Sequence, residues 1–319
     1  MVDDVLAIVA PGQGAQTPGF LMPWLADERC AASLRWLSAV AGLDLADYGT
    51  NADAATIRDT AVAQPLLVAA GLVAARALLG PSPVPGNAVL AGHSVGEITA
   101  AALAGVLSSE QAMVFVRERG RQMARAAAST PTSMTAIIGG DPAEVTAAVE
   151  AAGLTIANNN GAGQLVAAGT TEQLAALAAD PPARARLAPL SVAGAFHTAH
   201  MRPAVAHLMN LVQAIHTDAP GARLLTNADG RIVTDGRAYL AGLVNQVAAG
   251  VRWDLCLATM SRLGVTGLLE LPPAGTLTSI AKRNLRGVET FALNTPDQLP
   301  EARDFVVRHA ADEATGEAA

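Results

Sequence analysis

The feature that most constrains this chain is a pentapeptide, Gly92-His93-Ser94-Val95-Gly96, between a short apolar run and an alanine-rich segment. The apolar run at 88–91 predicts a buried strand, and the alanine-rich segment predicts a helix. A serine on a sharp strand-to-helix turn needs glycines two residues before and after it, because a Cβ there would strike the neighbouring backbone. The pattern predicts a nucleophile elbow, with the Ser94 hydroxyl above a helix N-terminus that favours negative charge. A chance match in a loop is the alternative, and the flanking strand and helix count against it.

Composition indicates a packed globular protein and limits its partners. Of the 319 residues, 51% are hydrophobic and 15% charged, which suits a folded core rather than a disordered chain. The net charge of −7 argues against a nucleic-acid partner. The chain starts with acids instead of the basic residues of a signal peptide, and no apolar run is expected to reach the roughly 20 residues of a membrane helix. We expect a cytoplasmic protein with no membrane partner and, by default, a monomer.

The two cysteines, Cys30 and Cys256, lie among apolar neighbours. They give neither a metal-ligand spacing nor a disulfide framework, so we interpret them as packed free thiols. No metal site is expected.

The pattern of strands and helices divides the chain. Residues 1–130 and 194–319 mix buried apolar strands with helices, which predicts one large α/β unit with a parallel sheet. Residues 131–193 follow a β-α-β-β-α-β order, which predicts a small ferredoxin-like subdomain inserted into the large unit. The strands of the small unit are expected at 135–138, 154–157, 164–168 and 187–192, and its helices at 142–152 and 171–179.

The large unit should contain several further elements. Its strands are expected at 6–10, 88–91, 265–271 and 289–293, and its helices at 64–79, 201–215, 237–248 and 252–263. The Asp229-Gly230 pair is a turn signal, so residues 224–233 are expected to form a hairpin.

Ser94 needs a proton acceptor, and the six histidines supply the candidates. His93 adjoins the nucleophile and should point elsewhere, and three others lie in or beside expected helices: His207, His216 and His309. His197 and His200 remain. His197 lies where the chain leaves the inserted segment, a place that can face a cleft or can simply pack a domain junction. No Asp or Glu stands out as the orienting third group, and a backbone carbonyl can fill that role.

One arginine lies on the apolar face of an expected helix. Ser108 and Gln111 have the spacing of a capping box, so a helix should begin there and continue to residue 127. At about 100° per residue, Arg119 falls inside the apolar arc of that helix. Burying an unpaired guanidinium costs several kcal/mol, so a carboxylate partner is expected. The alternatives are an internal Asp or Glu, a side chain that reaches solvent, or a substrate carboxylate held by two parallel hydrogen bonds.

Five motifs occur in an order and spacing that identify a family. They are Gly12-Gln13-Gly14-Ala15-Gln16, Gly92-His93-Ser94-Val95-Gly96-Glu97, Arg119-Gly120, Ala195-Phe196-His197, and Asn245-Gln246-Val247 leading to Val251-Arg252-Trp253. With them, nearly the whole chain resembles the malonyl-CoA:acyl-carrier-protein transacylases of fatty-acid and polyketide synthesis. The first two motifs are common to acyltransferases, whereas the full set is specific. The resemblance implies a hydrolase-like α/β domain with an inserted ferredoxin-like subdomain.

The resemblance also implies roles for individual residues. Ser94 would be the nucleophile and His197 the base, with the backbone carbonyl of Gln246 orienting His197. The backbone N–H groups of Gln13 and Val95 would form the oxyanion hole.

The same resemblance implies the substrate contacts. Arg119 would bind the malonyl carboxylate, and His93 and Asn158 would line the cleft. Malonyl-CoA would be the donor, the phosphopantetheine thiol of an acyl carrier protein the acceptor, and no cofactor would be needed. Carrier proteins are typically acidic, so a cationic surface near the cleft is expected, with five candidates: Arg184, Arg186, Lys282, Arg283 and Arg286.

Three other functions fit parts of the pattern. A serine esterase or thioesterase would use the same elbow with a structural Arg119. A non-catalytic module that binds acyl carriers would form no acyl-enzyme. A methylmalonyl-selective transferase would differ only in pocket width, although Phe196 before His197 resembles the malonyl-selective form.

Overall fold

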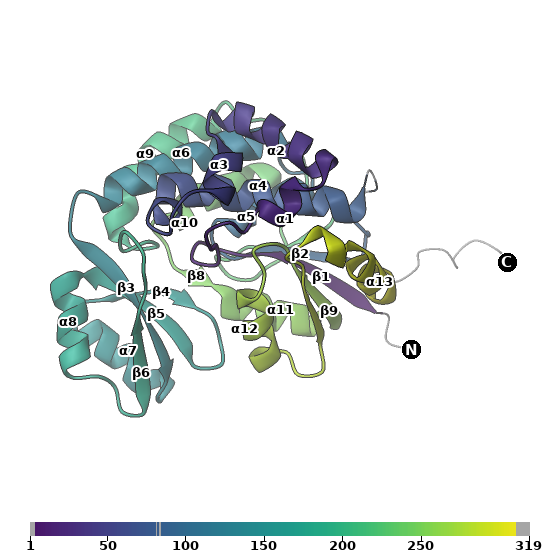
Figure 1. Cartoon of the computed structure of the whole chain (residues 1–319). Helices are drawn as coiled ribbons and strands as arrows, with labels where there is room; N and C mark the ends of the chain where they lie inside the picture. Colours follow the sequence, from purple (N-terminus) through teal and green to yellow (C-terminus); the bar gives the residue numbers. More distant parts are fainter. Residues whose placement is uncertain (1–3, 81, 83, 311–319) are drawn as a thin grey trace.

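Two five-stranded sheets organise the computed structural model, which describes residues 4–80, 82 and 84–310 (Figure 1). The larger sheet has the order β10-β9-β1-β2-β7, and all its pairings are parallel. Its strands are β1 (Val5–Ala10), β2 (Val89–Gly92), β7 (Arg223–Leu224), β9 (Val265–Glu270) and β10 (Glu289–Ala292). The prediction of a parallel α/β unit is confirmed.

Helices cover both faces of the larger sheet, which explains why β1 is apolar at every position. Its even-numbered residues join one core cluster and its odd-numbered residues join another. The first face carries α1 (Met22–Leu25), α2 (Glu28–Ala41), α3 (Leu45–Thr50), α4 (Thr60–Leu79), α5 (Gly96–Leu103), α6 (Ser109–Ala127), α9 (Arg202–Val212), α10 (Gly236–Gln246) and α13 (Leu299–His309). The opposite face carries α11 (Trp253–Arg262) and α12 (Thr276–Asn284). Three short 3-10 helices complete the chain: η1 (Thr56–Arg58), η2 (Ala199–Met201) and η3 (Pro296–Gln298).

The smaller sheet has the order β6-β3-β5-β4-β8. Its elements are β3 (Thr132–Gly139), α7 (Pro142–Ala151), β4 (Thr155–Asn159), β5 (Gln164–Thr170), α8 (Thr171–Ala179) and β6 (Ala185–Pro189), the expected ferredoxin-like succession. The fifth strand, β8 (Val251–Arg252), pairs in parallel with β4 although it comes from the later part of the chain. Division of the chain at residues 130 and 194 stays a prediction, and β8 crosses that division.

Helix α4 differs from the expectation. It begins at Thr60, four residues before the predicted start, because the Asp59 side chain accepts from the Ala61 N–H and caps it. The resulting 20-residue helix is apolar enough to cross a membrane, so the expectation that no run reaches that length was wrong. In the structure, 83% of its apolar window is buried inside the protein. The apolar residues of α4 therefore belong to the core of this protein.

The predicted hairpin at 224–233 is reduced to a single antiparallel bridge between Leu225 and Ile232. The residues just before it, Arg223–Leu224, pair in parallel with β2 instead. Strand β2 of the parallel sheet competes with the hairpin for these residues. A turn signal depends on neighbouring residues alone and cannot reveal such a distant partner.

Candidate active site

Ser94 lies on the turn between β2 and α5, with a positive φ of 54°. This left-handed conformation costs about 1 kcal/mol or more for a residue with a side chain, so the surroundings must impose it. A Cβ on Gly92 would overlap the backbone of Gly96, and a Cβ on Gly96 would overlap the Ala10 carbonyl. Both glycines are therefore required for the close backbone contacts that hold the turn, as the pentapeptide predicted.

His197 is the histidine that reaches the serine. Its Nε2 lies 2.7 Å from Ser94 Oγ, and its Nδ1 lies 2.8 Å from the main-chain carbonyl oxygen of Gln246. A carbonyl can only accept, so Nδ1 carries the proton and Nε2 is free to accept from the serine hydroxyl. The domain-junction alternative for His197 gives way to a hydrogen-bonded Ser94–His197–Gln246 chain.

Burial and charge keep the His197 ring neutral. The side chain is 4% exposed, and burial, followed by the positive charge of Arg119, lowers its pKa from 6.5 to about 3. A neutral imidazole at neutral pH can accept a proton from the serine.

Arg119 is buried beside the nucleophile, on the apolar face of α6 as predicted. It is 1% exposed; its Nη1 donates to Gln64 Oε1 at 2.7 Å and its Nη2 to Ser94 Oγ at 3.4 Å. It forms no salt bridge with any carboxylate in the described part of the chain. Burial lowers its pKa to about 10, opposed by the charge of Glu97. Its internal partner is thus an amide on α4, which leaves donors for a further acceptor.

Gln13 and Val95 follow β1 and Ser94, at the carboxyl edge of adjacent parallel strands. Within residues 4–80, 82 and 84–310, neither backbone N–H group donates a hydrogen bond. The Gln13 side chain is anchored to the Arg58 carbonyl and Thr60 hydroxyl at 3.2 and 3.4 Å. Their role as an oxyanion hole stays a prediction.

His93 has a partner that the sequence did not reveal. Its Nε2 lies 3.0 Å from Asn160 Oδ1, and its ring meets the Trp253 ring edge-on at a centroid distance of 5.7 Å. Asn158 lies on β4 and pairs with Val251 of β8, and its buried Oδ1 has no partner among the described residues. The hydrogen-bond partner of His93 is therefore Asn160, and the expectation that His93 and Asn158 line the cleft stays a prediction.

Two further polar residues support the site. Asn227 Oδ1 accepts from the Ser94 N–H at 2.8 Å, and Asn227 Nδ2 donates to the Gly92 carbonyl at 2.8 Å. Glu97, completely buried, accepts from the Asn227 N–H at 2.7 Å and from the side-chain amide of Gln246. Asn227 has no local signal because it is 133 residues from Ser94. Glu97 directly follows the Gly92–Gly96 pentapeptide. An acidic residue among the apolar residues of the following helix was the sequence signal that could have pointed to its role.

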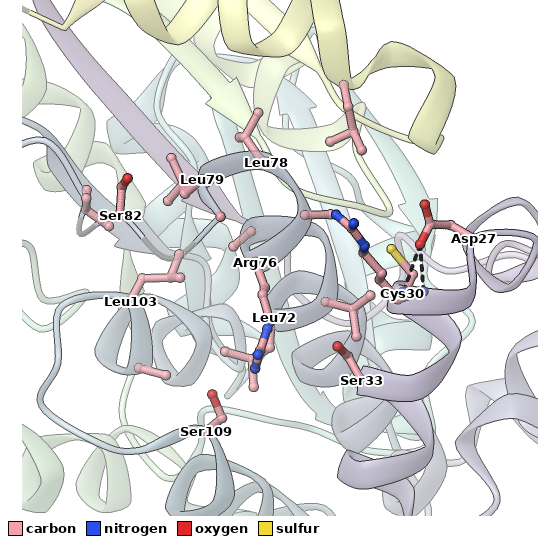
Figure 2. Close-up of a pocket in the computed structure, with 18 of the residues that line it drawn as sticks. Asp27, Cys30, Ser33, Leu72, Arg76, Leu78, Leu79, Ser82, Leu103 and Ser109 are labelled. Atoms are coloured by element: carbon pink, nitrogen blue, oxygen red, sulfur yellow. Dashed lines mark hydrogen bonds between the residues drawn. The ribbon is translucent and has the colours of Figure 1, made fainter.

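A cavity of about 850 Å³ lies elsewhere, among α2, α4, α5 and α13. Figure 2 shows Leu72, Arg76 and Leu103 along it, with Cys30 and Asp27 at one end. None of the residues around Ser94 lines it, so it is separate from the candidate active site. Within the described ranges, no cluster of three His, Cys, Asp or Glu residues could hold a metal ion.

A comparison with protein families identifies the family of the chain. The protein-family model described as the acyl transferase domain matches residues 8–289 of the chain. The chain therefore belongs to the acyl transferase family.

Within that family, the chain is similar to malonyl transacylases. The malonyl CoA-acyl carrier protein transacylase of Mycobacterium tuberculosis is 48% identical over 298 residues, covering 93% of this chain and 99% of the relative. The crystal structure of MCAT from Mycobacterium tuberculosis matches with a TM-score of 0.89 and 47% identity, over 94% of this chain and 99% of that one. A type II PKS acyl-carrier protein in complex with its malonyl-transacylase provides another match, with a TM-score of 0.86, 30% identity and coverage of 94% and 99%. These likenesses confirm the hydrolase-like α/β fold with a ferredoxin-like subdomain.

Gly92→Ala should disrupt the elbow. Its Cβ would overlap the backbone at Gly96 and Glu97, so we expect a loss of more than about 3 kcal/mol or a failure to fold. The matched control is Gly242→Ala on α10, where nothing lies within 4 Å of the new Cβ and up to about 1 kcal/mol should be gained. Thermal unfolding measures both, and a stable Gly92→Ala protein would contradict the steric account.

His197 should make stability depend on pH. Its pKa falls from 6.5 to about 3 on folding, so its contribution is full above pH 6.5 and is lost as the pH falls toward 3. Between about pH 7 and about pH 5, the wild-type protein should lose about 2 kcal/mol more unfolding free energy than His197→Gln. Urea titrations at both pH values measure this difference; equal losses would mean that the folded protein protonates His197 freely.

Proposed function

We propose that this chain transfers a malonyl group from malonyl-CoA to the phosphopantetheine thiol of an acyl carrier protein, through an ester on Ser94. The observation that carries the proposal is the Arg119 guanidinium. It is 1% exposed, has no carboxylate partner among the described residues, and lies 3.4 Å from the nucleophilic oxygen. A buried cation in that position needs an anion, and the free carboxylate of a malonyl group supplies it.

The first half-reaction forms the acyl-enzyme. His197 Nε2 takes the proton from Ser94 Oγ, at 2.7 Å, as the oxygen attacks the thioester carbonyl. The N–H groups of Gln13 and Val95 stabilise the tetrahedral oxyanion, and one such donor contributes about 3–4 kcal/mol in other enzymes. The C–S bond then breaks, and His197 returns the proton to the departing coenzyme A thiol.

The second half-reaction repeats these steps with a different thiol. The carrier thiol gives its proton to His197 and attacks the Ser94 ester, and the serine oxygen leaves with that proton. Arg119 holds the malonyl carboxylate, so the ester stays in the buried site where few water molecules can reach it. In this proposal neither half requires a cofactor, because the thioester of the substrate malonyl-CoA already activates the acyl group for attack by Ser94.

Substrate binding should also tune the base. The charge of Arg119 is the second cause of the low pKa of His197, after burial. A malonyl carboxylate paired with Arg119 would offset that charge and raise the pKa of His197 toward the range in which it exchanges protons well. The substrate carboxylate thereby improves the base as well as fixing the acyl group.

The carrier protein would dock on exposed cations near the mouth of the site. Lys282, Arg283 and Arg286 lie at the end of α12, and Arg184 and Arg186 lie at β6; all five are exposed. Arg283 donates to Gln164 of β5 at 2.6 Å, so α12 meets the smaller sheet there. An acidic carrier could contact both groups of cations at once.

Residues 131–193 would form one wall of the cleft, since they carry Asn160 to His93. We place the protein in the cytoplasm, where its two free thiols, Cys30 and Cys256, would stay reduced.

The acyl-enzyme can be observed directly. After incubation with malonyl-CoA, intact mass spectrometry should show one added malonyl group on the wild-type chain and none on Ser94→Ala. Absence of the adduct from the wild-type chain would favour a non-catalytic binding module.

Arg119→Ala should change the preference between acyl groups. Without the guanidinium, acylation by malonyl-CoA should fall about 100-fold or more relative to acylation by acetyl-CoA, because only the malonyl group loses an ion pair. The ratio of the two rates, measured on one protein sample, is independent of the fraction that is folded. Equal losses for both donors would favour an esterase or thioesterase with a structural Arg119.

A further inference from the structure

One carboxylate is connected to both the nucleophile and the base. Glu97 lies in the first turn of α5, three residues after Ser94, and is completely buried. Its two oxygens accept hydrogen bonds from Asn227, Tyr239 and Gln246. These donors come from α10 and from the segment after β7, so the carboxylate joins three parts of the large unit.

The first connection leads to the base. The Gln246 side-chain amide donates to Glu97 Oε2, while the main-chain carbonyl of the same residue accepts from His197 Nδ1 at 2.8 Å. Gln246 is the last residue of α10, where a carbonyl has no partner within the helix. Fixing the Gln246 side chain therefore fixes the residue whose carbonyl sets the tautomer and direction of the His197 ring.

The second connection leads to the nucleophile. The Asn227 N–H donates to Glu97 Oε1 at 2.7 Å. The Asn227 side chain then spans the elbow, accepting from the Ser94 N–H and donating to the Gly92 carbonyl, each at 2.8 Å. Asn227 is itself completely buried, so these bonds have no competition from solvent.

A buried carboxylate is an unfavourable hydrogen-bond acceptor if its only function is to stabilise the fold. Glu97 forms no salt bridge within the described ranges, and burial raises its pKa to about 7, opposed by the hydrogen bonds from Asn227 and Gln246. A neutral or apolar group would avoid this desolvation penalty. What the carboxylate offers is an acceptor at both ends, which suits two donors whose positions both matter.

We propose that Glu97 is the positioning residue of this site, which holds Ser94 through Asn227 and His197 through Gln246 so that Oγ and Nε2 stay within hydrogen-bonding distance. The inference rests on the proposed acyl transfer for its biological purpose, but the geometry that it concerns is that of any serine nucleophile. Its test can therefore use a reagent that contains no malonyl group.

The test is the labelling rate of Ser94 by a fluorophosphonate at about pH 8, where Glu97 is mostly ionised. In this reaction the Ser94 Oγ–P bond forms, fluoride leaves, and His197 takes the serine proton. Glu97→Met keeps the length of the side chain but carries no oxygen, so neither the Gln246 amide nor the Asn227 N–H keeps its acceptor. We expect labelling at least about tenfold slower than in the wild-type chain.

The exchange Glu97→Gln with Gln246→Glu in one chain should restore the rate. The new carboxylate at 246 accepts from the new amide at 97, and labelling should return to within about threefold of wild type. Tyr239→Phe is the matched control, because it removes the 3.3 Å hydrogen bond that the Tyr239 hydroxyl donates to Glu97. Tyr239 itself forms no link to Ser94 or His197. Its midpoint of thermal unfolding should fall while its labelling stays within about twofold.

Wild-type labelling of Glu97→Met, or an exchange variant that labels as slowly as Glu97→Met, would overturn the proposal. If Glu97→Met does not fold, Gln246→Met cuts the connection to His197 alone and should slow labelling about tenfold, and an unchanged rate would again overturn it. Malonyl-CoA acylation, followed by intact mass in the same samples, reports separately on the proposed function. A chain that labels normally but takes no malonyl group would contradict acyl transfer and leave the labelling comparison valid.

Discussion

The turn at Ser94 depends on contact between two pieces of backbone that any side chain would push apart. Gly92 touches the backbone at Gly96, and Gly96 touches the carbonyl of Ala10 at the end of β1. That second contact links the elbow to the neighbouring strand and fixes its height above the sheet. Gln13 follows that strand. The same backbone contact therefore determines the position of Ser94 relative to the N–H groups proposed as oxyanion donors.

Around this turn, burial acts against charge on three ionisable groups at once. It lowers the pKa values of His197 and Arg119 and raises that of Glu97. His197 is thereby neutral and able to accept a proton, while Arg119 keeps a charge that its Gln64 partner cannot neutralise. Among the described residues Arg119 has no carboxylate within salt-bridge distance, and a substrate with an anionic end would supply one.

Local patterns in the sequence were sufficient for much of this arrangement. The glycine spacing around Ser94, the capping box of α6 and the misplaced Arg119 each depend on residues within a few turns of one another, and the structure has all three. The β-α-β-β-α-β order was equally visible, because each of its elements has its own periodicity.

Long-range partners could not be found in this way. Gln64, Asn160 and Asn227 are ordinary polar residues, and their bonds to Arg119, His93 and Ser94 span 55, 67 and 133 residues. Local patterns also left His197 and His200 open; the family resemblance favoured His197, and the fold brings it to Ser94 while His200 lies in η2. For the same reason, Arg223–Leu224 joins the parallel sheet where only a local hairpin was evident.

The strand β8 has a consequence for how this protein would tell one acyl group from another. It begins five residues after Gln246, ends next to Trp253, and is hydrogen-bonded to the edge of the smaller sheet. Any hinge motion that swung the two sheets apart would have to break that pairing, which lies close in the chain to the Gln246 carbonyl that accepts from His197. The pairing therefore opposes such an opening, and we expect selectivity among acyl groups to depend on the fixed shape of the site more than on closure around the substrate.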